Sequence, residues 1–136
     1  MNNEKKYIGE FIPIDKILKE LDKIFYTSRF PNEVAKFTVD LSIARTNKRL
    51  SSIGGGEGLF DYNVKYPTWH YLKILKKGTG TWTLTFEMLG KRTISLENDE
   101  VLLGDEIYLE FTELYFTNTS QTGVVSPVFW LEKRYF

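Results

Sequence analysis

The chain begins with a helical pattern of apolar residues. Pro13 suits a helix start, where its missing N–H costs nothing, and Asp15 complements the dipole of the first turn. The apolar positions would occupy an arc of about 120° on a helix, the width of a core-facing stripe. They are Ile14, Ile17, Leu18, Leu21, Ile24 and Phe25. This spacing predicts an amphipathic α-helix at about residues 14–26, within an N-terminal segment of residues 1–30.

From residue 35 onward the apolar residues recur with a period of two, which is typical of β-strands with one buried face. Residues 35–43 alternate in this way, and residues 81–88 do so more strongly, with Trp82, Leu84 and Phe86 facing away from a row of threonines. Further strands are predicted near residues 94–96, within 107–116, and from about Pro127 to Tyr135.

The alternation also predicts how strands pair. If residues 78–80 form a hairpin loop, Ile74 lies opposite Leu84 and Leu72 lies opposite Phe86, so that apolar residues share one face. For the next hairpin, a three-residue loop at 90–92 would place Met88 opposite Ile94, whereas a two-residue loop would mix the faces. After Phe111 the parity changes to Leu114 and Phe116, which predicts a bend or bulge near residues 112–113.

These elements predict a mainly β protein, an antiparallel β-sandwich of jelly-roll-like form with about seven strands and one N-terminal α-helix; a partly closed barrel is the alternative. We expect a single domain over residues 1–136, with the sandwich at 35–135. Residues 46–68 are the least regular stretch and contain the run Gly54-Gly55-Gly56-Glu57-Gly58. A mobile loop is predicted there.

Composition excludes several kinds of chemistry. The 136 residues contain no cysteine, so disulfides, thiolate metal sites and a cysteine nucleophile are ruled out. The single histidine, His70, cannot form the multi-histidine site of a metal-binding cupin. Eighteen basic and 18 acidic side chains give zero net charge, which does not favour nucleic acid or an anionic membrane as partner. With no apolar run of about 20 residues and a polar start, neither a transmembrane segment nor a signal peptide is predicted.

Two kinds of charged cluster are candidate binding or catalytic sites. Acidic residues at 97–100 and 105–106 could hold calcium, and two of Glu87, Glu97 and Asp99 could form a glycosidase pair. The spacing matches no calcium-binding loop, so polar turns are the better interpretation. Basic residues near Arg45 and Arg49 are interpreted as a solvated face. We therefore predict no catalytic, metal-binding or cofactor-binding residues and no cofactor.

Aromatic residues make up 15% of the chain, and two of them have the parity of the outward face. Tyr108 and Tyr115 alternate against their apolar neighbours, so they are expected on the surface. Outward aromatic rings indicate either a protein interface or a sugar-binding platform, and the first is the commoner. The candidate interface comprises these two tyrosines and the apolar stripe of the helix: Ile14, Ile17, Leu18, Leu21, Ile24, Phe25, Tyr108 and Tyr115.

The C-terminal half resembles small β-sandwich virion proteins of tailed bacteriophages over about residues 68–133. The resemblance is carried by Ile94-Ser95-Leu96-Glu97, by residues 103–111, by Glu113-Leu114-Tyr115-Phe116-Thr117-Asn118 and by a turn containing Gly123. It implies a non-enzymatic structural component of a phage or virus particle, such as a head decoration, head-fibre, collar or tail-associated protein.

Such a protein would act through protein–protein assembly in the virion, as a homo-oligomer and with other virion proteins. Its amphipathic helix would pack on its own sandwich or dock on a neighbouring subunit, and the sequence leaves both open. The alternative function is a carbohydrate-binding β-sandwich module that uses outward aromatic rings to bind a glycan.

Overall fold

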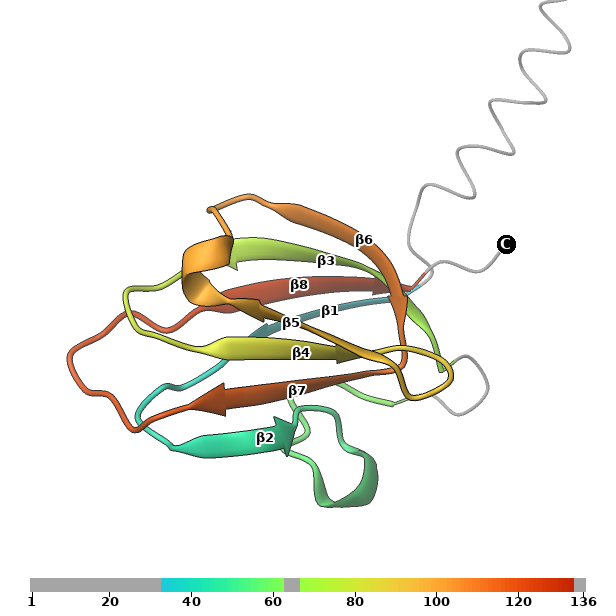
Figure 1. Cartoon of the computed structure of the whole chain (residues 1–136), viewed down its shortest axis with the longest axis horizontal. Helices are drawn as coiled ribbons and strands as arrows, with labels where there is room; N and C mark the ends of the chain where they lie inside the picture. The colour runs from blue at the N-terminus through green and yellow to red at the C-terminus, as the bar shows by residue number, and fades with distance from the viewer. Residues whose placement is uncertain (1–32, 63–66, 134–136) are drawn as a thin grey trace, which may run out of the picture. The chain divides into compact units, whose positions relative to one another are not determined.

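The computed structural model describes residues 33–62 and 67–133, which form two antiparallel four-stranded sheets packed face to face (Figure 1). Sheet I has the order β1-β8-β3-β6, with β1 at Glu33–Thr38, β8 at Val128–Lys133, β3 at Trp69–Lys76 and β6 at Glu106–Phe111. Sheet II has the order β2-β7-β4-β5, with β2 at Arg45–Arg49, β7 at Glu113–Asn118, β4 at Thr83–Glu87 and β5 at Thr93–Glu97. The predicted mainly β sandwich is confirmed, with eight strands in place of seven.

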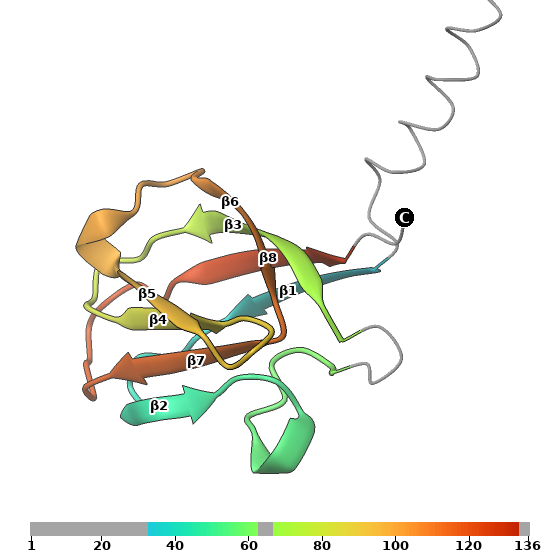
Figure 2. The same ribbon diagram turned by 45° about the vertical axis from the view of Figure 1, so that its right-hand side comes forward.

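The strands form four nested antiparallel pairs, in which the first strand of the chain pairs with the last. β1 pairs with β8, β2 with β7, β3 with β6 and β4 with β5, in each case antiparallel. Contacts of β3 with β8 and of β4 with β7 join these pairs into the two sheets. Figure 2 shows the result as two layers, with β5 and β6 on the same side.

The core lies between the sheets and is filled by the residues whose parity marked them as inward. Leu72, Ile74, Leu84 and Phe86 have no exposed surface. Aromatic rings contact one another across the core: the ring of Trp82, the residue before β4, packs edge to face against that of Phe129 in sheet I, with ring centroids 5.4 Å apart. Close packing of this kind is what makes large side chains the dominant contribution to stability in a sandwich.

The predicted helix at 14–26, and with it the N-terminal segment 1–30, lies outside the described residues. The single-domain prediction over 1–136 also extends beyond them and stays a prediction. In the part of the chain that the structure describes, the only helical elements are two short 3-10 turns, η1 at Ile53–Gly55 and η2 at Asn98–Glu100. None of its helices is long and apolar enough to cross a membrane.

The predicted hairpin between β3 and β4 is wrong. The two strands belong to different sheets, and residues 77–82 carry the chain from one layer to the other. Thr79 holds this crossing through its N–H to the Val125 carbonyl at 3.0 Å, while Gly78 takes a φ of 79° that favours glycine. Parity could not detect the error, because apolar residues of β3 and β4 face each other equally well across the core.

The β4–β5 hairpin has the predicted three-residue loop, but it lies one residue earlier in the chain. The Met88 N–H bonds to the Arg92 carbonyl at 2.7 Å, so the loop is Leu89 to Lys91 and Phe86 lies opposite Ile94. The cause is local backbone geometry, because Gly90 and Lys91 both take positive φ values, 84° and 65°.

The predicted bend at residues 112–113 is confirmed and is the point where the chain leaves sheet I for sheet II. Thr112 donates both its N–H and its hydroxyl to the Glu87 carbonyl, at 2.7 and 3.1 Å. The first predicted strand ends earlier than residue 43, at Thr38, and the last begins one residue after Pro127.

The prediction of a mobile loop at 46–68 is wrong over most of its described length. β2 occupies Arg45–Arg49, with a register shift where it pairs with β7, and η1 follows. The N–H groups of Glu57 and Gly58 then bond back to the carbonyls of Arg49 and Ser51. β2 contains no apolar residue, so no hydrophobic alternation could reveal it.

Candidate functional site

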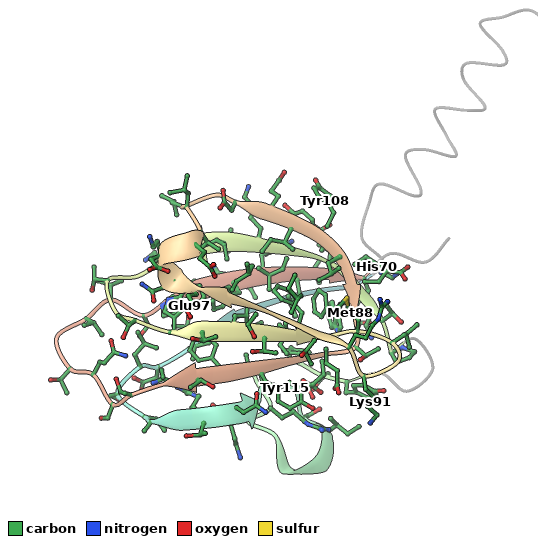
Figure 3. The ribbon with its side chains drawn as sticks, viewed as in Figure 1. His70, Met88, Lys91, Glu97, Tyr108 and Tyr115 are labelled. Carbon is green, nitrogen blue, oxygen red and sulfur yellow. The ribbon has the colours of Figure 1, made fainter. Side chains whose placement is uncertain are left out.

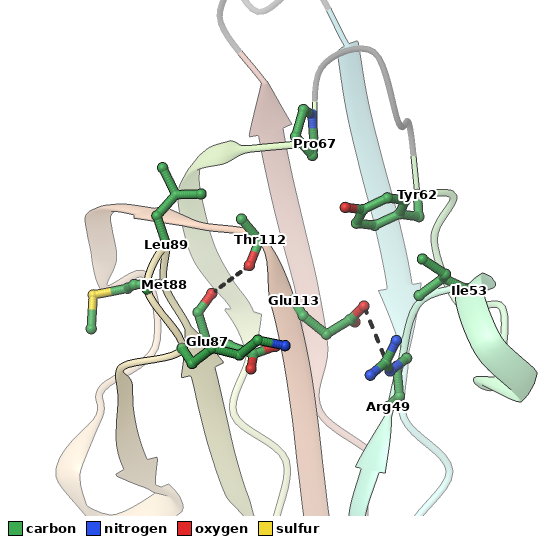
Figure 4. A pocket seen from close by; sticks show the side chains of 11 residues that line it. Arg49, Ile53, Tyr62, Pro67, Glu87, Met88, Leu89, Thr112 and Glu113 are labelled. Carbon is green, nitrogen blue, oxygen red and sulfur yellow. Dashed lines mark hydrogen bonds and ion pairs between the residues drawn. The ribbon is translucent and has the colours of Figure 1, made fainter.

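Two surface regions of the sandwich could act on another molecule. The first, which we name the polar cleft, is a hollow of about 280 Å³ where β2, β4 and β7 meet (Figure 4). It is lined by Arg49, Ile53, Tyr62, Pro67, Glu87, Met88, Leu89, Gly90, Lys91, Thr112 and Glu113.

Glu113 is the most buried charged group of the polar cleft. Its side chain is 4% exposed, and the carboxylate accepts hydrogen bonds from the Ser51 hydroxyl at 2.5 Å and from the Leu114 N–H at 3.0 Å. The Ser51 N–H donates to the same carboxylate at 3.3 Å, and Arg49 Nε lies 4.0 Å away. Because a buried polar group is costly unless it is hydrogen-bonded, these contacts satisfy the carboxylate oxygens and tie β7 to the segment after β2.

Tyr115 extends the same network across sheet II. The Arg49 guanidinium lies over its ring at 5.5 Å and donates to its hydroxyl at 3.0 Å, and that hydroxyl donates to Glu87 at 3.2 Å. Burial raises the pKa of the Tyr115 phenol, and the neighbouring Arg49 charge opposes this rise. The phenol therefore stays neutral and serves as a hydrogen-bonded link between β2, β7 and β4.

The arrangement of the polar cleft suits a structural role. Glu87 and Glu113 lie directly opposite each other on β4 and β7, but each is already bonded to a neighbouring side chain or backbone group. A glycosidase needs one carboxyl group that can give up a proton and one that is free to attack or activate water. The bonds of Glu113 instead fill its acceptor sites with protein donors.

The second region, which we name the open side, follows β5, β6 and the segments around them. Of the eight large hydrophobic residues that are exposed in the described part, five lie there: Leu89, Ile94, Leu102, Leu103 and Tyr108. A cleft of about 360 Å³ lies within it and is lined by Met88, Leu89, Arg92, Tyr108, Leu109 and Glu110. Apolar side chains exposed together in this way mark surfaces that contact other molecules.

The two predicted surface tyrosines differ. Tyr108 is 69% exposed at the open side (Figure 3), as its parity indicated, and its ring lies 5.1 Å from that of Tyr71. Tyr115 points outward from sheet II but is half-buried, with the Arg49 guanidinium over its ring, and its role as an interface residue stays a prediction. Ile14, Ile17, Leu18, Leu21, Ile24 and Phe25 lie outside the described residues, and their role stays a prediction.

The predicted solvated basic face is wrong for Arg45. Its guanidinium is buried, forms an ion pair with Glu57 and donates to Asn118 Oδ1 at 3.2 Å and to the Asp40 carbonyl at 2.7 Å. Arg45 thereby ties the segment after β1 and the segment after η1 to the end of β7. In a polar segment, the sequence does not distinguish an arginine that is buried and paired from one that is exposed to solvent.

His70 is the second residue of β3, and its Nε2 lies 3.7 Å from a Glu110 carboxylate oxygen. Across residues 33–62 and 67–133, no group of three or more histidine, aspartate or glutamate side chains is placed to hold a metal ion.

Sequence reasoning missed the leucines and Ile94 of the open side. The run Val101-Leu102-Leu103 gives no signal that separates core from surface, because Val101 is buried in the core whereas Leu102 and Leu103 are exposed. Comparisons with protein-family models, with curated proteins and with solved structures find no match. The function must therefore be argued from the geometry of this chain.

Proposed function

We propose that this chain is a non-enzymatic structural component of a phage or virus particle, a head decoration, head-fibre, collar or tail-associated protein that acts by protein–protein assembly. The observation that carries the proposal is the open side, where exposed apolar residues lie beside two strands at sheet edges. Assembly proteins work through complementary surfaces of this kind.

The strand pairing adds support. Four nested antiparallel pairs, β1–β8, β2–β7, β3–β6 and β4–β5, correspond to the jelly roll, an arrangement used by viral capsid proteins and also by lectins and cupins. A fold alone does not assign function, so the choice among these classes depends on the sites. The closed network of the polar cleft argues against an enzyme, and the open side argues for assembly.

The test is to purify particles over a density gradient and to identify their proteins by mass spectrometry. We expect the chain to co-purify with the particles in a fixed ratio to the major shell protein. Its presence only in the soluble fraction, in repeated preparations of intact particles, would overturn the proposal.

A second candidate, glycan binding, is favoured by one feature of the open side. The exposed ring of Tyr108 lines the 360 Å³ cleft together with the Arg92 guanidinium and the Glu110 carboxylate. An aromatic face flanked by hydrogen-bonding charges can bind a sugar ring. Glycan-array binding that is lost in Tyr108→Ala and retained in Tyr115→Ala would support this function in place of assembly.

A further inference from the structure

β5 lies at the edge of sheet II, and one side of its backbone pairs with no strand in the described part of the chain. The Asn98 N–H bonds to the Trp82 carbonyl at 3.0 Å and the Met88 N–H to the Arg92 carbonyl at 2.7 Å, which sets the alternation of the β4–β5 ladder. The backbone groups of Thr93, Ser95 and Glu97 therefore point away from β4. An edge of this kind is a template on which another strand can pair.

One of these edge groups is already occupied. The Glu97 N–H donates to the Glu100 carboxylate at 2.8 Å, which closes the capping box of η2. The backbone groups of Ser95, the Thr93 N–H and the Glu97 carbonyl still point to the free edge. They are sufficient for a short antiparallel ladder centred on Ser95.

The charges flanking β5 make it complementary to itself. In an antiparallel pairing about Ser95, Thr93 of one copy faces Glu97 of the other, and Ile94 faces Leu96. Beyond the ladder, Lys91 and Arg92 before β5 in one copy would come to the same end as Asp99 of η2 in the other copy. Lys91, Arg92 and Asp99 are all exposed, and none of them forms an ion pair with a residue in the described part of the chain.

The two other edge strands with described flanks at both ends lack this property. Self-pairing of β6 about Tyr108 would place Glu106 against Glu110, and self-pairing of β2 would place Arg45 against Arg49. Like charges directly opposite each other destabilise a strand pair. β2 also has a register shift, which disfavours addition of a further strand.

The apolar surface at β5 supports the same pairing. Ile94 is 48% exposed although its side chain lies on the inner face, because no strand follows β5 in sheet II. A second copy of β5 would set its Leu96 against this Ile94, and its own Ile94 against Leu96. Both apolar residues of the edge would then be covered by symmetry-related neighbours.

We infer that two copies of this chain associate through β5, paired antiparallel about a two-fold axis at Ser95, so that the two copies of sheet II become one continuous sheet. The inference rests on the proposed assembly function, for which it supplies a self-association surface. Such an interface is isologous, because the same patch of each copy contacts the other. Figure 3 labels Lys91 and Glu97 at the two ends of this edge.

Cross-linking tests the register directly, because the full chain contains no cysteine. Ser95→Cys places two thiols opposite each other, at a Cα separation of about 5.5 Å for such a pair. A short bismaleimide should then give a covalent dimer. The matched control is Thr93→Cys, which is on the same edge and equally exposed, but whose two copies would lie roughly 13 Å apart along the strands. It should stay monomeric alone and cross-link when mixed with Glu97→Cys.

Charge reversal provides the second measurement and separates association from folding. We expect Lys91→Glu with Arg92→Glu, and separately Glu97→Lys with Asp99→Lys, to raise the dimer dissociation constant by about tenfold or more in sedimentation velocity. An equimolar mixture of the two variants should dimerise again, which a misfolded protein could not do.

Two results would overturn the β5 inference: no cross-link at Ser95→Cys, or an equal yield of dimer from Thr93→Cys. They would leave the proposed virion function standing if the chain is still found in purified particles. Conversely, a β5 dimer that is absent from particles would overturn the proposed function while supporting the pairing.

Discussion

The polar cleft and the open side both include residues of the β4–β5 turn, yet they differ in how their polar and apolar groups are paired. In the cleft, the buried carboxylate has partners, since Glu113 lies between Ser51 and Arg49. At the open side, apolar side chains such as Ile94 are exposed at the edge of the sheet, and β5 pairs with a strand of the described residues on one side only.

The difference separates stability from interaction. A buried polar group that has its partners contributes to a unique fold, and loss of one partner is costly because the other remains buried. An exposed apolar residue at a sheet edge contributes little to the free energy of folding. It contributes to the free energy of association when a partner covers it. Mutations at the cleft should therefore change unfolding, and mutations at the open side should change association.

Replacing Glu113 should have the largest effect. Glu113→Ala removes the acceptor for the Ser51 hydroxyl and for two backbone N–H groups, and we expect the free energy of unfolding to fall by about 2–3 kcal/mol. Urea denaturation of the purified chain measures this loss. The control is Glu110→Ala, whose side chain is 69% exposed and whose removal should change stability by less than about 0.5 kcal/mol. Equal losses in the two variants would contradict a structural role for the cleft.

Tyr115→Phe should have an intermediate effect. It keeps the ring beneath Arg49 but removes the hydroxyl that bonds to both Arg49 and Glu87, so a loss of about 1 kcal/mol is expected. The matched change on the exposed tyrosine, Tyr108→Phe, should leave the urea midpoint unchanged. If the two substitutions were equivalent, the hydroxyl of Tyr115 would not link the strands.

Alkaline pH should weaken the fold through its buried tyrosines. Burial, and then the hydrogen bond from Tyr71 to Glu106 at 2.7 Å, raise the pKa of Tyr71, and burial also raises the pKa of Tyr115. Since the folded state favours the neutral phenols, their stabilisation is complete below the unfolded pKa of about 10 and is lost as pH rises through the folded values. Urea unfolding at several pH values above 9 should show this decline, with a smaller slope in Tyr71→Phe. An unchanged slope in that variant would contradict the assignment to Tyr71.

Ile94→Ser should have the smallest effect on folding. Because Ile94 is half-exposed at the sheet edge, we expect a change in unfolding free energy of less than about 0.5 kcal/mol. The same variant should nevertheless sediment more slowly than the wild-type chain at high protein concentration, because it loses the contact with Leu96 of the second copy. A large loss of stability with unchanged association would contradict the assignment of the open side to association.

Sequence reasoning succeeded where one local property decided the structure. The period of two identified the buried faces of β3, β4, β6 and β7, and the change of parity near Thr112 located the bend between the sheets. It failed for β2, whose residues Arg45–Arg49 are all polar, because a strand at a sheet edge can be held by backbone pairing and a buried guanidinium without any apolar side chain.

The candidate sites were less predictable than the fold. Tyr108 was identified by parity, but Tyr115 has the same parity and is covered by Arg49, a residue 66 positions away along the chain. The partners of Glu113 are similarly distant, since Ser51 lies 62 positions earlier. Contacts over such separations depend on which strands become neighbours.

The amino-acid sequence by itself determined that the described part is a two-faced β protein without thiol chemistry, and which residues of most strands turn inward. Tertiary structure decided which strand lies beside which, because inward faces of either sheet satisfy the same alternation and hydrophobic burial has no direction. That choice left β5 with a neighbouring strand on one side only among the described residues, which explains both the exposed Ile94 and the self-complementary edge.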